Sequence, residues 1–208
     1  MLRAIAALSA IAATAVLLRM GRDLGRAARF HAAEQTLQPI REELDELAAF
    51  LRAQPQPVAT LTGVASSTAD YDAFEGTYPA PFLQHGTPPF DLKGGEFKRD
   101  AEGTPIIARI ETLRFVITIP KGDVPSGGFP IVLYSHGTGG SYKSVLGGEA
   151  KALATRGVAT VGIDQVLHGP RSSPDASCFG YEGELCFFNP VNVVGGRNNG
   201  RQAALDNI

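Results

Sequence analysis

Hydrophobic positions near the N-terminus recur at helical spacing. Five aliphatic residues lie three or four positions apart: Leu37, Ile40, Leu44, Leu47 and Leu51. This spacing places them on one face of a helix and leaves the acidic residues between them on the opposite face. The pattern predicts a helical appendage over residues 22–54, which Pro39 starts or kinks. Two prolines at 55 and 57 then end it.

From residue 55 onward the pattern is typical of strands. Residues 58–64 alternate loosely, and residues 109–119 are rich in β-branched side chains, so both are expected to be strands. The stretch between them, residues 71–98, contains several prolines. Because proline lacks an amide N–H, we expect an irregular loop there rather than a central strand.

A strand–turn–helix–strand unit follows. Residues 129–134 and 158–163 are short continuous apolar runs, as expected of strands that are buried on both faces. Residues 144–156 between them have a helical pattern, and Gly157 stands where a C-terminal cap is expected. The unit has the size of a right-handed βαβ crossover. A further helix is expected over residues 198–208.

These patterns predict an α/β fold with a mainly parallel sheet, preceded by an N-terminal helical segment. Three parts are expected: an apolar segment over residues 1–21, the helical appendage over 22–54, and one α/β domain over 55–208. The chain has 208 residues, of which 44% are hydrophobic, so it can bury a core of ordinary size. Its net charge of −2 argues against a nucleic-acid partner, which normally selects a basic face.

The N-terminal apolar segment has three interpretations. Arg3 precedes an apolar run from Ala4 to Leu18, which is shorter than the roughly 20 residues that span a bilayer. It is an export signal or uncleaved anchor, an alanine-rich soluble helix, or the product of a misassigned start. We expect the first, so that the protein is exported (periplasmic, extracellular or membrane-anchored) and able to associate with a membrane through this segment.

The chain has two cysteines, Cys178 and Cys186, in one loop rich in glycine and proline. They either form a disulfide in an oxidising compartment or remain free thiols, and we expect the disulfide. No histidine or further cysteine nearby completes a metal site. Neither a metal nor an organic cofactor is expected.

A glycine-rich turn carries the clearest chemical signal. The first buried strand leads into His136-Gly137-Thr138-Gly139-Gly140. Such a turn lets a ligand approach backbone N–H groups, which can stabilise the negative charge that forms on a carbonyl oxygen during acyl transfer. An H-G-x-G turn at this place forms half of the oxyanion hole in α/β-hydrolases. We expect the N–H groups of Thr138 and Gly139 to be the donors.

The glycine-rich turn has two other interpretations, a phosphate-binding loop and a turn that only allows tight packing. Residues 137–144 come close to a phosphate-binding P-loop, but Tyr142 stands before Lys143 where that loop requires glycine. The glycines could also serve only to allow tight packing.

Three segments resemble one family. Residues 128–140 are similar to the oxyanion strand of exported bacterial α/β-hydrolases, the virulence-factor lipase and esterase group. Residues 162–171 resemble the next strand and its exit loop, and residues 189–202 resemble the lead into the helix before the nucleophile strand. The resemblance implies a serine on a G-x-S-x-G elbow, followed by an acid and then a histidine.

No serine of the chain lies in such an elbow. Ser135 lacks the first glycine of the motif, and Ser141 lacks the second. The family's elbow would follow the helix that begins near Asn198. We therefore expect the chain to be the N-terminal part of a hydrolase, truncated before the nucleophile, acid and histidine, and inactive alone.

Asp164 and His168 follow the second buried strand, where active sites of α/β proteins form. Acid–base work is one interpretation. However, the family's acid and base lie later in the chain, so we expect Asp164 to hold the loop through backbone N–H groups and His168 to pack it. Three arginines, Arg171, Arg197 and Arg201, could pair with Asp164 or with an acidic substrate.

The function predicted from the sequence is that of the front part of a serine carboxylic-ester hydrolase acting on a small-molecule ester or lipid. The alternative is a non-catalytic binding or structural protein of the cell envelope built on a hydrolase-like sheet.

Overall fold

The computed structural model describes residues 34–35, 37–172, 177–178 and 181–208. The chain forms two compact units, Met1–Glu46 and Leu47–Ile208. In the first unit, residues 37–46 are helical; the second opens with helical residues 47–52. This confirms the predicted helix over its described part. The apolar segment 1–21 lies outside the described residues. In the described residues, no helix is long and apolar enough to cross a membrane.

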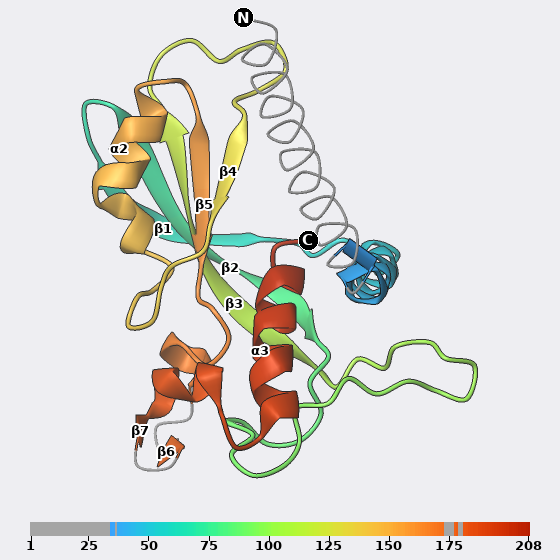
Figure 1. The fold of residues 1–208 in the computed structure, drawn as a ribbon. Helices are drawn as coiled ribbons and strands as arrows, with labels where there is room; N and C mark the ends of the chain where they lie inside the picture. The colour runs from blue at the N-terminus through green and yellow to red at the C-terminus, as the bar shows by residue number, and fades with distance from the viewer. Residues whose placement is uncertain (1–33, 36, 173–176, 179–180) are drawn as a thin grey trace, which may run out of the picture. The chain divides into compact units, whose positions relative to one another are not determined.

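The second unit is built on a five-stranded sheet (Figure 1). Its strands are β1 (Thr60–Ser67), β2 (Tyr71–Phe82), β3 (Arg109–Pro120), β4 (Ile131–Tyr134) and β5 (Ala159–Ile163). Their order across the sheet is β1-β2-β3-β5-β4. Only β4 and β5 are parallel, and the other three pairs are antiparallel. The mixed α/β class is confirmed, but the expectation of a mainly parallel sheet is wrong, because an antiparallel meander precedes the single βαβ unit.

The prediction of an irregular loop from residue 71 is also wrong. β2 is a twelve-residue strand that includes Pro79 and Pro81. β1 pairs with β2 only as far as Thr77, whereas β3 pairs with β2 along its whole length. Beyond Thr77, β2 needs hydrogen bonds on one side only. Since Pro79 and Pro81 are two positions apart, their missing N–H groups face the same, unpaired side.

β4 and β5 are joined by η1 (Ser144–Leu146) and α2 (Gly148–Ala154), which replace the single helix predicted over 144–156. The pair Gly147-Gly148 interrupts the helical pattern. Val145 and Ala150 of this connection are buried with Val116 of β3 in one hydrophobic cluster.

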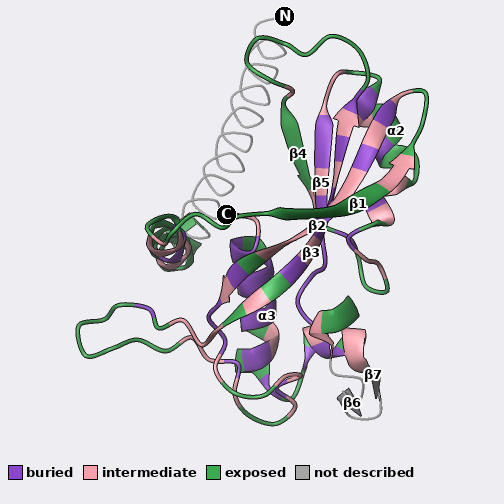
Figure 2. Cartoon of the chain, turned by 180° about the vertical axis from the view of Figure 1, so that it is seen from behind, coloured by how far each residue is buried: buried purple, intermediate pink, exposed green. Residues whose placement is uncertain are grey.

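β4 differs from the buried strand that its apolar sequence predicts. Ile131 is 57% exposed and Leu133 is 52% exposed, whereas β5 is almost fully buried (Figure 2). β4 is an edge strand with β5 on one side, and the described residues place no strand on the other. The expectation that β4 is buried on both faces is therefore wrong for this structure.

α3 (Val193–Leu205) begins five residues earlier than predicted, because the side chain of Asn192 accepts a hydrogen bond from the N–H of Gly195 and caps it. Short elements lie between β5 and α3: η2 (Gly169–Arg171), β6 (Ser177–Cys178), β7 (Tyr181–Glu182) and η3 (Gly183–Phe188). Cys186 is buried. The side chain of Cys178 lies outside the described residues, so the pairing stays a prediction.

Amide side chains of α3 and the segment before it hold the loop that follows β2. Asn192 donates to the carbonyls of Phe90 and Gly94, and Asn198 donates to the carbonyl of Gly95. Gln202 accepts from the N–H of Leu83. All three amides are buried. Because a buried backbone group needs a hydrogen-bond partner, these amides fix the loop after β2, whose backbone is not part of a β-sheet.

Candidate functional site

The glycine-rich turn leaves the carboxyl end of β4. The N–H of Gly140 donates to the carbonyl of Gly137 at 3.0 Å and closes the turn, and Gly139 has a φ of +79°. Gly137, Thr138 and Gly139 are exposed. Within the described part of the chain, their N–H groups have no hydrogen-bond acceptor. The turn therefore presents backbone donors to solvent.

His136 ties this turn to the loop that follows β5. Its Nε2 accepts from the backbone N–H of Gln165 at 3.1 Å, so its Nδ1 carries the proton and donates to the carbonyl of Gly137 at 2.8 Å. The ring is buried. A Cβ at Gly140 would lie 2.9 Å from His136, so this position needs glycine. His136, Gly137 and Gly140 thus form the frame of the turn.

Asp164 holds the other end of the turn. One carboxylate oxygen accepts from the N–H of Tyr142 at 3.1 Å, and the other accepts from Nε of Arg114 at 2.7 Å. The Asp164 side chain is 1% exposed. Because Tyr142 follows the turn by two residues, the carboxylate fixes where the chain goes after Gly140. Both carboxylate oxygens of Asp164 therefore accept hydrogen bonds within the protein, and the side chain is not exposed to solvent as a general acid or base would be.

His168 packs against His136, with ring centroids 4.8 Å apart in an edge-to-face arrangement. Its Nδ1 is hydrogen-bonded to the carbonyl of Val166, and its buried Nε2 has no partner among the described groups. Its ring also lies edge-to-face with Phe187. The structure thus brings His136 and His168 together beneath the turn, with Asp164 bonded to the segment that follows it.

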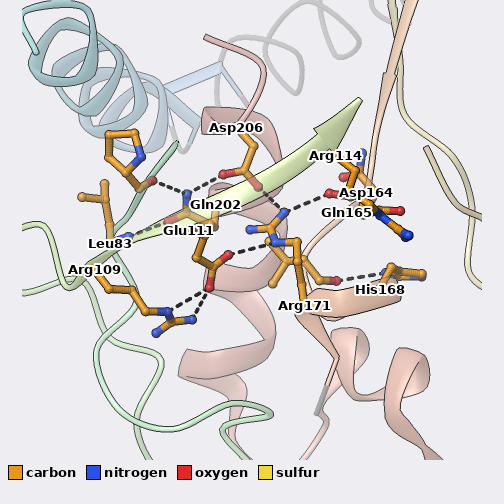
Figure 3. Close-up of polar contacts among 12 residues, drawn as sticks. Leu83, Arg109, Glu111, Arg114, Asp164, Gln165, His168, Arg171, Gln202 and Asp206 are labelled. Carbon is orange, nitrogen blue, oxygen red and sulfur yellow. Dashed lines mark hydrogen bonds and ion pairs between the residues drawn. The ribbon is translucent and has the colours of Figure 1, made fainter. Parts of the chain in front are cut away.

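A buried charged network was not foreseen from the sequence. Arg171 donates from Nε to Glu111 of β3 and from Nη1 to Asp206 beyond α3, at 2.9 and 2.6 Å (Figure 3). Burial raises the pKa of Asp206, and Arg171 opposes that rise. Burial lowers the pKa of Arg171, but the negative charges of Asp206 and Glu111 have the larger effect, so the pKa of Arg171 is raised overall.

Neither Arg171 nor Arg197 has a described contact with the Asp164 carboxylate. Arg171 contacts Asp164 only through the backbone carbonyl, at 2.9 Å, while Arg114 pairs with the Asp164 carboxylate. Arg197 donates to the side chain of Asn198. The bond between Arg171 and Glu111 joins residues 60 positions apart, a separation at which sequence patterns give no signal.

Glu75 of β2 connects the sheet to the segment after the turn. Its carboxylate accepts from the Tyr142 hydroxyl and from Lys143, each at 2.6 Å. The hydrogen bond from Lys143, followed by that from Tyr142, holds the pKa of Glu75 below its usual value. A carboxyl group whose pKa is lower in the folded than in the unfolded state stabilises the fold at pH values above its unfolded-state pKa. That stabilisation is lost as the pH falls through its folded-state pKa.

We predict that Glu75→Gln lowers the melting temperature by about 2 °C near neutral pH, since a partly exposed ion pair is weak. At a pH low enough to protonate Glu75 in the folded as well as the unfolded state, wild type and variant should melt together. Thermal melts at several pH values measure this. Glu96→Gln, which removes a surface carboxylate 3.6 Å from Lys98, is the control. A difference that persists at acid pH would contradict the assignment.

The turn's backbone conformation gives a second prediction. Gly139→Ala should lower the free energy of unfolding by about 1–2 kcal/mol, because an L side chain is disfavoured at positive φ. Gly137→Ala should change it by less than about 0.5 kcal/mol, since its φ is not positive and no atom lies within 4 Å of the added Cβ. Urea denaturation compares the two. Equal effects would mean that the turn does not hold this conformation in solution.

The described residues contain no group of three or more histidine, cysteine, aspartate or glutamate side chains that could hold a metal ion. After the glycine-rich turn comes η1, and the seven-residue α2 starts only at Gly148. The turn therefore does not lead directly into a helix as a P-loop does.

No protein-family model matches the chain, and no curated protein matches it. The solved structures that are similar to it include the following two. One is the acetyl xylan esterase from Paenibacillus sp. R4, with 18% identity and a TM-score of 0.36, over 64% of this chain and 33% of that one. The other is a putative acetyl xylan esterase from Bacteroides fragilis, with 15% identity and a TM-score of 0.39, over 71% of this chain and 34% of that one. The chain spans about a third of the length of both.

Proposed function

We propose that the turn after β4, His136 to Gly140, is the oxyanion-binding half of the active site of a serine carboxylic-ester hydrolase. One observation carries the proposal: exposed backbone N–H groups at Gly137, Thr138 and Gly139 have no acceptor in the described part of the chain. His136 and Asp164 hold that turn from its two ends. Donors that are fixed before the reaction stabilise a tetrahedral intermediate without reorganisation.

In this mechanism the carbonyl oxygen of an ester lies against the turn. As a nucleophile adds to the carbonyl carbon, the C=O π bond opens and the oxygen takes the negative charge. Each N–H that donates to this oxygen then contributes about 3 kcal/mol to lowering the barrier. Of the residues in this chain, Thr138 and Gly139 are the donors, and His136 and Asp164 are positioning residues.

The nucleophile would come from a segment that pairs with β4. The open edge of β4 supports this, because the exposed side chains of Ile131 and Leu133 and the unpaired backbone of an edge strand favour a further strand. A strand added there would end beside the turn, since parallel strands share their carboxyl ends at one edge of the sheet. A serine following that strand would then lie next to the proposed donors.

An ester assay tests this division of roles. Residues 1–208 should release no more p-nitrophenolate from p-nitrophenyl acetate than the heat-denatured chain. Turnover above that control would place a nucleophile within these residues and contradict the proposal. In the coding sequence, a G-x-S-x-G elbow after α3 would support it.

The second candidate is a non-catalytic binding or structural protein on the same sheet. Both candidates predict that residues 1–208 contain no G-x-S-x-G elbow, so the coding sequence after Ile208 decides between them. A stop codon directly after Ile208, together with an inactive protein, would select it over the hydrolase. Export and membrane association stay proposals for either candidate, because the apolar segment that carries them lies outside the described residues.

A further inference from the structure

An open cavity of about 570 Å³ lies beside the charged network, and the proposed oxyanion site does not use it. Its walls come from the start of β3, from the loop after β2 and from the loop after β5. Its lining includes the polar residues Thr87, Arg109, Glu111 and Arg171. The cavity is therefore assembled from three segments that are distant in the sequence.

Arg109 is held in a fixed orientation at the wall. Its guanidinium lies 3.9 Å from the centre of the Phe82 ring, which is 1% exposed. Its Nε and Nη2 both donate to one carboxylate oxygen of Glu111 (Figure 3). In the described structure Nη1 has no partner. Glu111 thus occupies one edge of the guanidinium and leaves the Nη1–Nη2 edge for another planar acceptor.

Arg171 supplies a second unused donor. Its side chain is only 5% exposed and its Nη2 is buried without a partner among the described residues, although Nε and Nη1 are both bonded. A buried donor without an acceptor is costly and is a common mark of a group that a ligand or water completes. Thr87 is an exposed residue of the same wall.

The charges are arranged with the cation outermost. The side chain of Arg109 is 34% exposed, that of Glu111 is 15% exposed and that of Asp206 is 1% exposed. Counted together with Arg171, these four groups sum to zero. However, both acids are covered by their arginine partners, so a ligand in the cavity meets N–H donors first. An acceptor with two coplanar oxygens fits this arrangement better than a cation or an apolar group.

We propose that this cavity binds the carboxylate of a small organic acid, with Arg109 as the main contact and Arg171 as a further donor. The carboxyl end of β5 and the start of the antiparallel β3 lie at the same end of the sheet as the turn after β4. If the proposed function holds, the cavity selects esters that carry a carboxylate away from the reacting bond. Binding itself does not depend on that function.

Isothermal titration with monomethyl succinate and dimethyl succinate tests the proposal, since the two differ in one carboxylate. We expect wild type to bind the monoester at least about tenfold more tightly, the value of one hydrogen-bonded charge. Arg109→Gln should abolish this preference.

Lys98→Gln is the matched control, because it removes one positive charge from a residue outside the cavity wall. It should leave the preference unchanged. Equal binding of the two esters by wild type, or an equal loss in Lys98→Gln and Arg109→Gln, would overturn the proposal. Gly139→Ala should retain monoester binding, so the carboxylate pocket and the oxyanion turn can fail separately.

Discussion

Replacing Gly162 with alanine is expected to destabilise the protein by about 3 kcal/mol. Gly162 lies in the buried strand β5, and a Cβ there would be 2.4 Å from the carbonyl oxygen of Tyr142. That obstacle is backbone rather than the end of a flexible side chain, so the segment after the turn must move. Overpacking of this kind costs about 1–3 kcal/mol, and a backbone clash lies at the upper end.

Gly63→Ala provides the control for this experiment. Gly63 is also a strand glycine, but no atom lies within 4 Å of the Cβ that alanine would add. Urea denaturation should therefore show a large loss for Gly162→Ala and a change within about 0.5 kcal/mol for Gly63→Ala. If the two variants were equally stable, the close approach of Tyr142 to β5, and with it the placement of the turn, would be wrong.

Asn192→Ala is expected to have an effect of similar size, about 3 kcal/mol. Loss of the helix cap costs about 1 kcal/mol. The side chain also donates to the carbonyls of Phe90 and Gly94, and each lost bond adds about 1 kcal/mol. Asn189 still reaches the Phe90 carbonyl, but Gly94 loses its described partner. The loop after β2 should therefore loosen together with the start of α3.

Asn207→Ala is the matched control, since its side chain donates a single hydrogen bond, to Ala203 within the last turn of α3. Hydrogen exchange locates the effect. In Asn192→Ala the amides of the 84–95 loop should exchange faster than in Asn207→Ala. Unchanged exchange in that loop would mean that the buried amides do not hold it.

The parts of the fold that follow from short-range patterns were predictable from the sequence. Residues 109–119 and 158–163 gave β3 and β5 because β-branched and apolar runs of this length fit buried strands. Gly157, expected as a helix cap, has a φ of +70°. In each case the deciding interactions lie within a few residues of one another.

The errors arose where the neighbours of a strand decide its environment. The prolines of β2 are tolerated because the pairing with β1 ends before them. The apolar β4 is exposed as an edge strand, with β5 as its one neighbouring strand among the described residues. Neither fact is encoded in the strand's own residues. The same holds for the candidate site: the glycine turn was visible in the sequence, but the Arg109–Glu111–Arg171–Asp206 network required the tertiary structure.

The central claim is that the turn after β4 binds an oxyanion, and titration of the ¹⁵N-labelled chain with methylphosphonate tests it directly. Two hydrogen bonds to a charged oxygen contribute about 4 kcal/mol, so a dissociation constant on the order of 1 mM is expected. The amide signals of Thr138 and Gly139 should shift in wild type and in Gly137→Ala, and much less in Gly139→Ala. Signals that do not move at saturating phosphonate, or that move equally in Gly139→Ala, would contradict the account.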